Sequence, residues 1–160
     1  MKRLVFLIVG GLLLLPLMAS AQVAGVGPRL GLSVDPDQFT FGGQLKIGPY
    51  SESFFIVPNL EIGVGDDLTI IQFNGDFDWM IPTNNSPVHP YIGGGLGIAY
   101  VDWDDRFQGN NSSSTEVGIN FLGGLEFANK SGNSSFFTEL RLGIGDLPDL
   151  KAMVGWNFGP

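Results

Sequence analysis

The sequence lacks the residues on which several kinds of protein depend. Its 160 residues include no cysteine and one histidine, His89. This excludes a disulfide framework and a thiolate zinc site. Only eight residues are basic against sixteen acidic ones, so the chain cannot neutralise a phosphate backbone and no nucleic-acid partner is expected. Apolar residues still make up 44% of the chain, and a mean hydropathy of +0.21 argues against disorder.

The first 21 residues resemble an export signal. Lys2 and Arg3 precede an apolar run over residues 4–18, and residues 19–21 (Ala-Ser-Ala) place small side chains before Gln22. The run is shorter than the ~20 residues that a spanning helix needs. We therefore expect a cleaved signal peptide, residues 1–21, and one domain, residues 22–160. Without Lys2 and Arg3, six basic residues remain against sixteen acidic ones, a net charge of −10.

The rest of the chain alternates with a period of two. In residues 71–79, Ile, Phe, Gly, Phe and Trp occupy one face, and Gln, Asn, Asp and Asp occupy the other. Seven turn-rich separators divide such runs into eight predicted strands. The strands cover residues 25–34, 38–48, 54–64, 68–81, 90–102, 116–128, 136–145 and 149–158. The pattern predicts an all-β fold, an eight-stranded antiparallel up-and-down transmembrane β-barrel preceded by a signal peptide.

The composition of the two faces indicates which one points inward. The apolar face is bulky and aromatic, as lipid contact allows, whereas the polar face is rich in glycine, as a narrow lumen filled by side chains requires. The polar face also carries charges of both signs in nearly equal number, which should pair inside the lumen. They are Arg29, Lys46, Glu61, Asp76, Asp78, Glu126, Glu139, Arg141 and Lys151. The competing interpretation is a soluble lipocalin-like lipid binder with the phenylalanines inside.

Three segments resemble the small outer-membrane barrels of the opacity-protein and OmpA/OmpX type. They are residues 90–99 (PYIGGGLGIA), residues 136–141 (FFTELR) and the terminal residues 154–158 (VGWNF). The resemblance implies a monomer in the outer membrane of a Gram-negative bacterium, in contact with lipid and lipopolysaccharide. It also implies an insertion signal at Trp156 and Phe158, read by the barrel-insertion machinery, although here Gly159 and Pro160 follow the final aromatic residue. The family supplies no catalytic residues and no cofactor.

The same resemblance places both chain ends on the periplasmic side, so the longest connection, residues 102–115, would face outward. Most aspartates then gather at this outer rim. Asp102, Asp104 and Asp105 could bind divalent cations shared with lipopolysaccharide phosphates, because hard cations favour carboxylate oxygens. The alternative is that these residues only start turns and solvate the loops.

The expected function is a structural or surface-interaction role, such as adhesion or envelope integrity, with the lumen plugged by ion pairs. A narrow gated porin-like channel is the alternative. A lipid A-modifying enzyme is less favoured, because His89 falls at the periplasmic end and no serine follows two residues later. Pro58 falls inside a predicted strand, where we expect a β-bulge.

Overall fold

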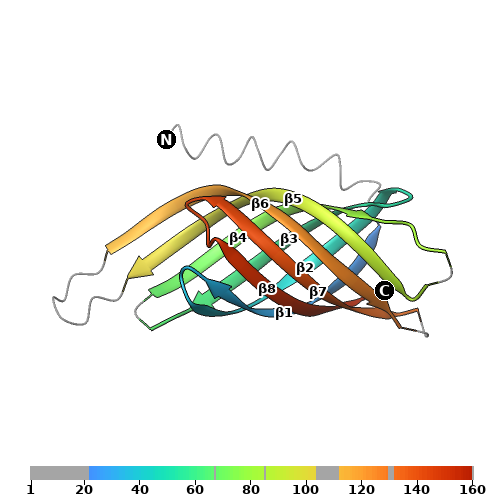
Figure 1. Ribbon diagram of the computed structural model, residues 1–160, viewed down its shortest axis with the longest axis horizontal. Helices are drawn as coiled ribbons and strands as arrows, with labels where there is room; N and C mark the ends of the chain where they lie inside the picture. Colours follow the sequence, from blue (N-terminus) through green and yellow to red (C-terminus); the bar gives the residue numbers. More distant parts are fainter. Residues whose placement is uncertain (1–21, 67, 85, 104–111, 130–131, 160) are drawn as a thin grey trace.

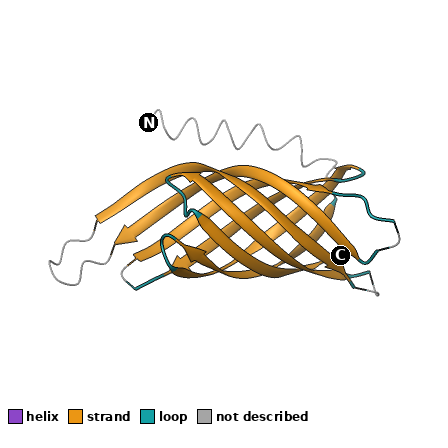
Figure 2. Ribbon diagram, in the orientation of Figure 1, coloured by secondary structure: helices purple, strands orange, loops and turns teal. Residues whose placement is uncertain are grey.

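The computed structural model describes residues 22–160 except 67, 85, 104–111, 130–131 and 160. Eight strands form a closed barrel in which each strand is antiparallel to its neighbours and β8 closes against β1 (Figures 1 and 2). They are β1 (Val23–Val34), β2 (Gln38–Ser51), β3 (Phe54–Val64), β4 (Leu68–Met80), β5 (Val88–Trp103), β6 (Ser112–Ala128), β7 (Ser134–Gly145) and β8 (Leu150–Phe158). Among the described residues no helix is long and apolar enough to cross a membrane.

The predicted antiparallel eight-stranded barrel is confirmed, and most strand bounds agree within two residues. The largest difference is at the start of β6, which begins at Ser112 and not at residue 116. Serine and threonine suit turns, and this composition made residues 112–115 resemble a loop. In the structure they pair with β5, with Ser112 opposite Trp103 and Thr115 opposite Tyr100. The predicted signal peptide, residues 1–21, lies outside the described residues.

The bulge expected at Pro58 is absent. Pro58 lies opposite Gly75 in an unbroken register with β4. Against β2, the register is the same before and after it, with Gln44 opposite Asn59 and Ile47 opposite Ile56. Proline has no N–H to donate toward β2. The β2–β3 ladder therefore lacks pairs at Pro58, but no extra residue is inserted in either strand. The irregularity lies instead between Ile47 and Ser51.

The barrel is polar inside and apolar outside. Along β8 the side chains alternate strictly between exposed and buried, and the same period runs through β4. Leu96 is 64% exposed and Trp79 is 61% exposed, whereas Asn74 is 0% and Arg141 is 1% exposed. This arrangement contradicts the lipocalin-like interpretation, which places the phenylalanines inside: Phe39, Phe73, Phe77 and Phe121 all lie on the outer surface.

Glycines on the inner face of β5 make room for the polar interior. A Cβ atom built on Gly95 would lie 2.7 Å from the Cα atom of Asp76 and against its carboxylate. Gly75, on the neighbouring strand and facing outward, has nothing within 4 Å of such an atom. The lumen therefore depends on the absence of a side chain at Gly95 and not at Gly75.

We expect Gly95→Ala to destabilise the barrel by about 1–3 kcal/mol, the usual range for overpacking in a filled interior. Gly75→Ala is the matched control and should leave stability equal or slightly raised, since alanine restricts the unfolded chain. Urea unfolding of both variants in lipid vesicles measures the difference. Equal stability of the two variants would contradict a tightly filled lumen.

Candidate functional site

The centre of the lumen is held by two arginines, and the first of them, Arg29, joins two acids from distant strands. Its Nη2 atom donates to Oε1 of Glu139 at 2.7 Å, and its Nε atom lies 3.1 Å from Oε1 of Glu61. Its Nη1 atom donates to Oε1 of Gln44 at 2.9 Å. Arg29 is 1% exposed. A side chain of β1 thus ties β2, β3 and β7 together across the interior.

The second arginine, Arg141, extends this network toward β4. Its Nη2 atom lies 2.7 Å from Oδ2 of Asp76 and 3.0 Å from Oε1 of Glu139, the oxygen that also accepts from Arg29. The other oxygen of Glu139 accepts from the Tyr91 hydroxyl at 3.0 Å. Glu139 is therefore the shared centre of two guanidinium groups and one phenol.

Lys151 of β8 extends the network of charges beyond Glu61. Its ammonium donates to Oε2 of Glu61 at 2.8 Å and to Oε1 of Gln72 at 2.5 Å. Glu61 accordingly stands between Lys151 and Arg29. Taken together, the six central charges form one continuous network from β8 through β3, β1 and β7 to β4.

A layer of side-chain amides fills the space beside these charges. Asn59 donates to Oδ2 of Asp76 at 2.7 Å and accepts from Asn74 at 2.8 Å. Oδ1 of Asn74 in turn accepts from Gln72 at 2.7 Å and from Asn120 at 2.8 Å. These amides were not among the predicted network members, although Gln72, Asn74 and Asn120 have the same inward phase as the charged members.

Lys46 and Glu126 form a separate ion pair near the end of the barrel where the chain begins and ends. Ser135 donates to the other carboxylate oxygen of Glu126 at 2.7 Å, and the Lys46 ammonium lies 4.4 Å from the centre of the Phe55 ring. A cavity of about 210 Å³ lies beside this pair. Glu126 is less buried than the central acids, with its side chain 15% exposed.

The opposite end of the lumen is closed by apolar side chains. Leu147, in the connection between β7 and β8, is 4% exposed and packs with Ile70, Ala99 and Val101 from β4 and β5. Gly97 and Gly118 leave the space that the Leu147 side chain occupies. This cap was not predicted, because one leucine in an aspartate-containing turn gives no periodic signal.

Asp78 differs from the other predicted network members. It is buried, with 7% of its surface exposed, and faces the lumen, but it forms no ion pair with any described residue. Its Oδ1 atom has no hydrogen-bond partner among the described residues. Four inward bases face five inward acids, so one acid must be left over, and the structure shows that it is Asp78.

The predicted cation site is only partly described. Asp102 lies near the C-terminal end of β5, opposite Ser113 and half-buried, while Asp104 and Asp105 lie outside the described residues. Among the described residues, no three acidic or histidine side chains gather where they could hold a metal ion.

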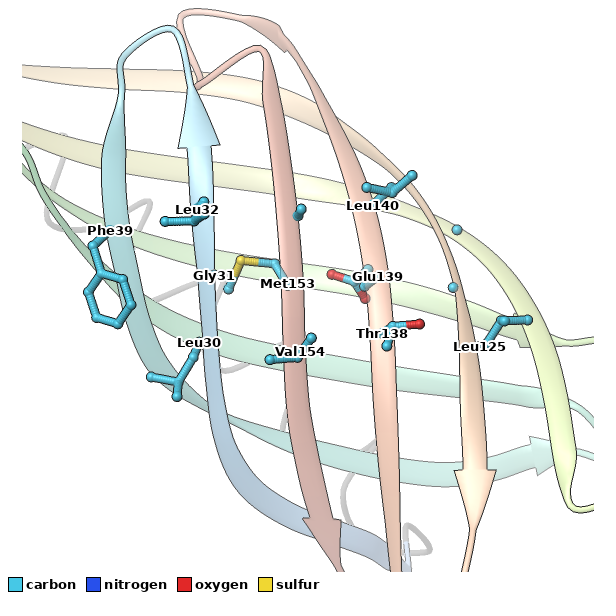
Figure 3. Close-up of a pocket in the computed structure, with 13 residues that line it drawn as sticks. Leu30, Gly31, Leu32, Phe39, Leu125, Thr138, Glu139, Leu140, Met153 and Val154 are labelled. Atoms are coloured by element: carbon cyan, nitrogen blue, oxygen red, sulfur yellow. The ribbon is translucent and has the colours of Figure 1, made fainter.

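A groove of about 760 Å³ crosses the outer surface over β1, β2, β6, β7 and β8 (Figure 3). Leucine side chains flank it, among them Leu30, Leu32 and Leu140, and small residues such as Ala152 and Gly31 form its floor. It is a mostly apolar hollow in the outer surface, although Thr138 and Glu139 also line it.

Comparison with known proteins identifies the fold. No protein-family model and no curated protein matches the sequence. The N-terminal β-barrel domain of Pseudomonas aeruginosa OprF matches with a TM-score of 0.71 and 14% identity, over 87% of this chain and 98% of that one. The chain has the fold of the small outer-membrane β-barrels. Ail, the attachment invasion locus protein of Yersinia pestis, has a TM-score of 0.60 and 12% identity, over 86% of this chain and 97% of its own.

Another small outer-membrane barrel, the enzyme PagL, matches with a TM-score of 0.52 and 16% identity, over 86% of this chain and 99% of its own. The resemblance seen in the sequence is thus confirmed at the level of fold. Because an enzyme and an attachment protein share this outer-membrane barrel, the fold alone does not assign an activity.

The two residues of the predicted insertion signal lie on the outer face of β8. Trp156 packs edge-on against Phe136 of β7 with ring centres 5.0 Å apart. Phe158 is the last residue of β8, is 51% exposed, and pairs with Val26 on one side and Ser134 on the other. The strand that carries them pairs continuously with β7, whereas its pairing with β1 is interrupted at Trp156 and Asn157.

We expect Arg141→Met to lower the free energy of unfolding by about 3–5 kcal/mol, because it leaves two buried carboxylates without one of their cations. Lys46→Met is the matched control and should cost about 1 kcal/mol or less, because its partner Glu126 is partly exposed. Adding Asp76→Asn to Arg141→Met should restore part of the loss. Urea unfolding in vesicles measures all three. An Arg141→Met variant no less stable than Lys46→Met would contradict the network's structural role.

Proposed function

We propose that this chain is an integral outer-membrane protein of a Gram-negative bacterium with a structural or surface-interaction role. In this proposal residues 1–21 are removed on export, and the barrel crosses the membrane as a monomer with its lumen plugged. The observation that carries the proposal is the inverted distribution of polarity, with a continuous charged network inside a barrel whose outer face is apolar.

The outer face has the chemistry that a bilayer requires. Its exposed side chains are leucine, isoleucine, valine and phenylalanine over all eight strands. The strands are 9 to 17 residues long, and about 9–11 residues of a tilted strand cross the hydrocarbon core. Trp79, Tyr100 and Trp156 lie on the same face near strand ends, where aromatic residues favour the membrane–water interface. Every strand has a hydrogen-bonded neighbour on both sides, so the barrel leaves no edge strand facing lipid.

The interior favours a plugged lumen rather than a channel. The central charges bridge strands that are not neighbours in the barrel, as the pairs Lys151–Glu61 and Arg141–Asp76 do. The amide layer fills the adjacent space, and Leu147 covers the outer mouth. Opening a water path would separate buried charges from their partners, at a cost of several kcal/mol for each ion.

We also propose that the role is not enzymatic. His89 is half-buried, and its Nδ1 atom lies 3.0 Å from the Thr83 hydroxyl, next to the turn that joins β4 and β5. This turn is at the end of the barrel that bears the chain termini, away from the outer loops. No nucleophile–base–acid arrangement is formed by His89 among its described contacts.

Planar-bilayer recording tests the proposal on protein purified in detergent from outer-membrane fractions, with a heat-dependent shift in gel mobility as the check on folding. Wild-type protein should show no steady conductance. Arg141→Ala, which removes both the charge and the volume, should conduct, whereas Arg141→Met, which restores the volume, should conduct much less.

Two outcomes would contradict the proposal in different ways. Steady conductance by the wild type would overturn the plugged lumen in favour of a channel. Recovery of folded protein from the soluble periplasmic fraction, without detergent, would overturn the membrane location itself.

A further inference from the structure

A hollow of about 570 Å³ lies where the turn between β2 and β3 meets the end of β4. The turn residues Ser51, Glu52 and Ser53 line it together with the rings of Phe54 and Trp79. In Figure 1 this turn lies at the right of the view, at the end of the barrel that also carries the C-terminus. We refer to these five residues as the turn hollow.

Strand pairing holds the two rings at one side of the turn hollow. Phe54, the first residue of β3, lies directly opposite Trp79 of β4, and the Met80 N–H donates to the Ser53 carbonyl at 2.8 Å. Phe54 also stacks on Phe77, with ring centres 5.8 Å apart and ring planes inclined by 19°. Trp79 is 61% exposed, so most of its indole surface is open to a ligand.

The turn supplies a carboxylate that has no cation beside it. Glu52 is exposed and forms no ion pair with any described residue. The lysines and arginines that the structure describes all face the lumen and are bound to acids there, namely Arg29, Lys46, Arg141 and Lys151. A free carboxylate next to an open indole face is suited to an ammonium group, through a charge-assisted hydrogen bond and a cation–π contact.

Uncharged hydrogen-bond donors lie around the same carboxylate. The indole N–H of Trp79 and the hydroxyls of Ser51 and Ser53 form no hydrogen bond with any described residue. Such donors can bind phosphate oxygens. A headgroup with a net negative charge is disfavoured, because Glu52 would repel it. The chemistry of the turn hollow therefore selects a zwitterion in which a phosphate and an ammonium group are close together.

We propose that the turn hollow binds the headgroup of a phospholipid with a primary ammonium group, as in phosphatidylethanolamine. The ammonium donates to the Glu52 carboxylate and lies against the Trp79 ring, while the phosphate accepts from the indole N–H and the serine hydroxyls. The acyl chains then lie along the apolar outer face beside Phe77. The inference rests on the proposed function, which places this end of the barrel in the periplasmic leaflet.

The test uses the full chain, exported with its own leader and purified from membranes in detergent, with a heat-dependent gel shift as the check on folding. Native mass spectrometry compares the binding of phosphatidylethanolamine, phosphatidylcholine and phosphatidylglycerol that share the same acyl chains. We expect phosphatidylethanolamine to bind about threefold more tightly than either of the others, which is the usual size of an exposed charge pair. Choline has no N–H to donate to Glu52, and phosphatidylglycerol has no cation.

Glu52→Gln keeps the shape of the side chain but removes its charge, and it should bring the three affinities to within about 1.5-fold of one another. Asp37→Asn is the matched control, because it removes the same charge from the exposed β1–β2 connection at the opposite end of the barrel. It should leave the threefold preference unchanged. Trp79→Phe should weaken the binding of phosphatidylethanolamine and phosphatidylcholine alike, by about twofold, since both headgroups carry a cationic nitrogen and a phosphate.

Methylation of the lipid nitrogen supplies the same test without altering the protein. The N,N-dimethyl form of phosphatidylethanolamine keeps one N–H, so its affinity should lie between those of phosphatidylethanolamine and phosphatidylcholine. An affinity equal to that of phosphatidylcholine, with the preference for the unmethylated lipid retained in Glu52→Gln, would contradict a hydrogen bond to this carboxylate.

Other results would also overturn the inference. Equal binding of the three lipids by the wild type would show that the turn hollow does not select a headgroup. An equal loss of preference in Asp37→Asn and Glu52→Gln would show a response to overall charge alone, and tightest binding of phosphatidylglycerol would identify an anionic lipid as the occupant. These results are read on folded protein in detergent, so they are distinct from failure of the membrane location, which fractionation reports.

Discussion

The need to pair charges inside a closed barrel governs the rest of this structure. Arg29 and Arg141 are each 1% exposed, and an unpaired ion in such a place would cost several kcal/mol. Each is held by two carboxylates, and Glu139 is shared between them. The strands that supply these groups are fixed relative to one another, because shifting any strand by one residue would send its charge to the outer surface.

The same constraint explains the glycines. Long charged side chains can cross the lumen only where the facing strand has little volume, and β5 supplies this at Gly93, Gly95 and Gly97. The Asp76 carboxylate, which accepts from Arg141, lies over Gly95. Composition and electrostatics are thus linked: the abundance of glycine and the scarcity of charge in the sequence both follow from a small interior that holds a few paired ions.

The alternation of residues was sufficient to predict the barrel, the inward charges and the outward aromatics, because a period of two assigns each residue to a face without knowledge of its neighbours. It could not assign partners. Which acid lacks a cation depends on how far each side chain reaches across the lumen, so Asp78 was indistinguishable from Asp76 in sequence. Residues 112–115 were misjudged because serine and threonine suit turns as well as strand edges, and Leu147 was missed because it belongs to no periodic run.

The outer end of the barrel combines two features that a single turn produces. If β7 continued along β6, it would pair with residues 112–116 as well, but the chain would then lack the short return that places Leu147 over the lumen. Gly145 directs the chain inward, so the mouth is closed by an apolar side chain and the neighbouring backbone is left unpaired. Glu116 on β6 and Asp102 on β5 place carboxylates beside this shorter pairing. Closure of the lumen and the early end of the β6–β7 pairing are therefore consequences of one local conformation.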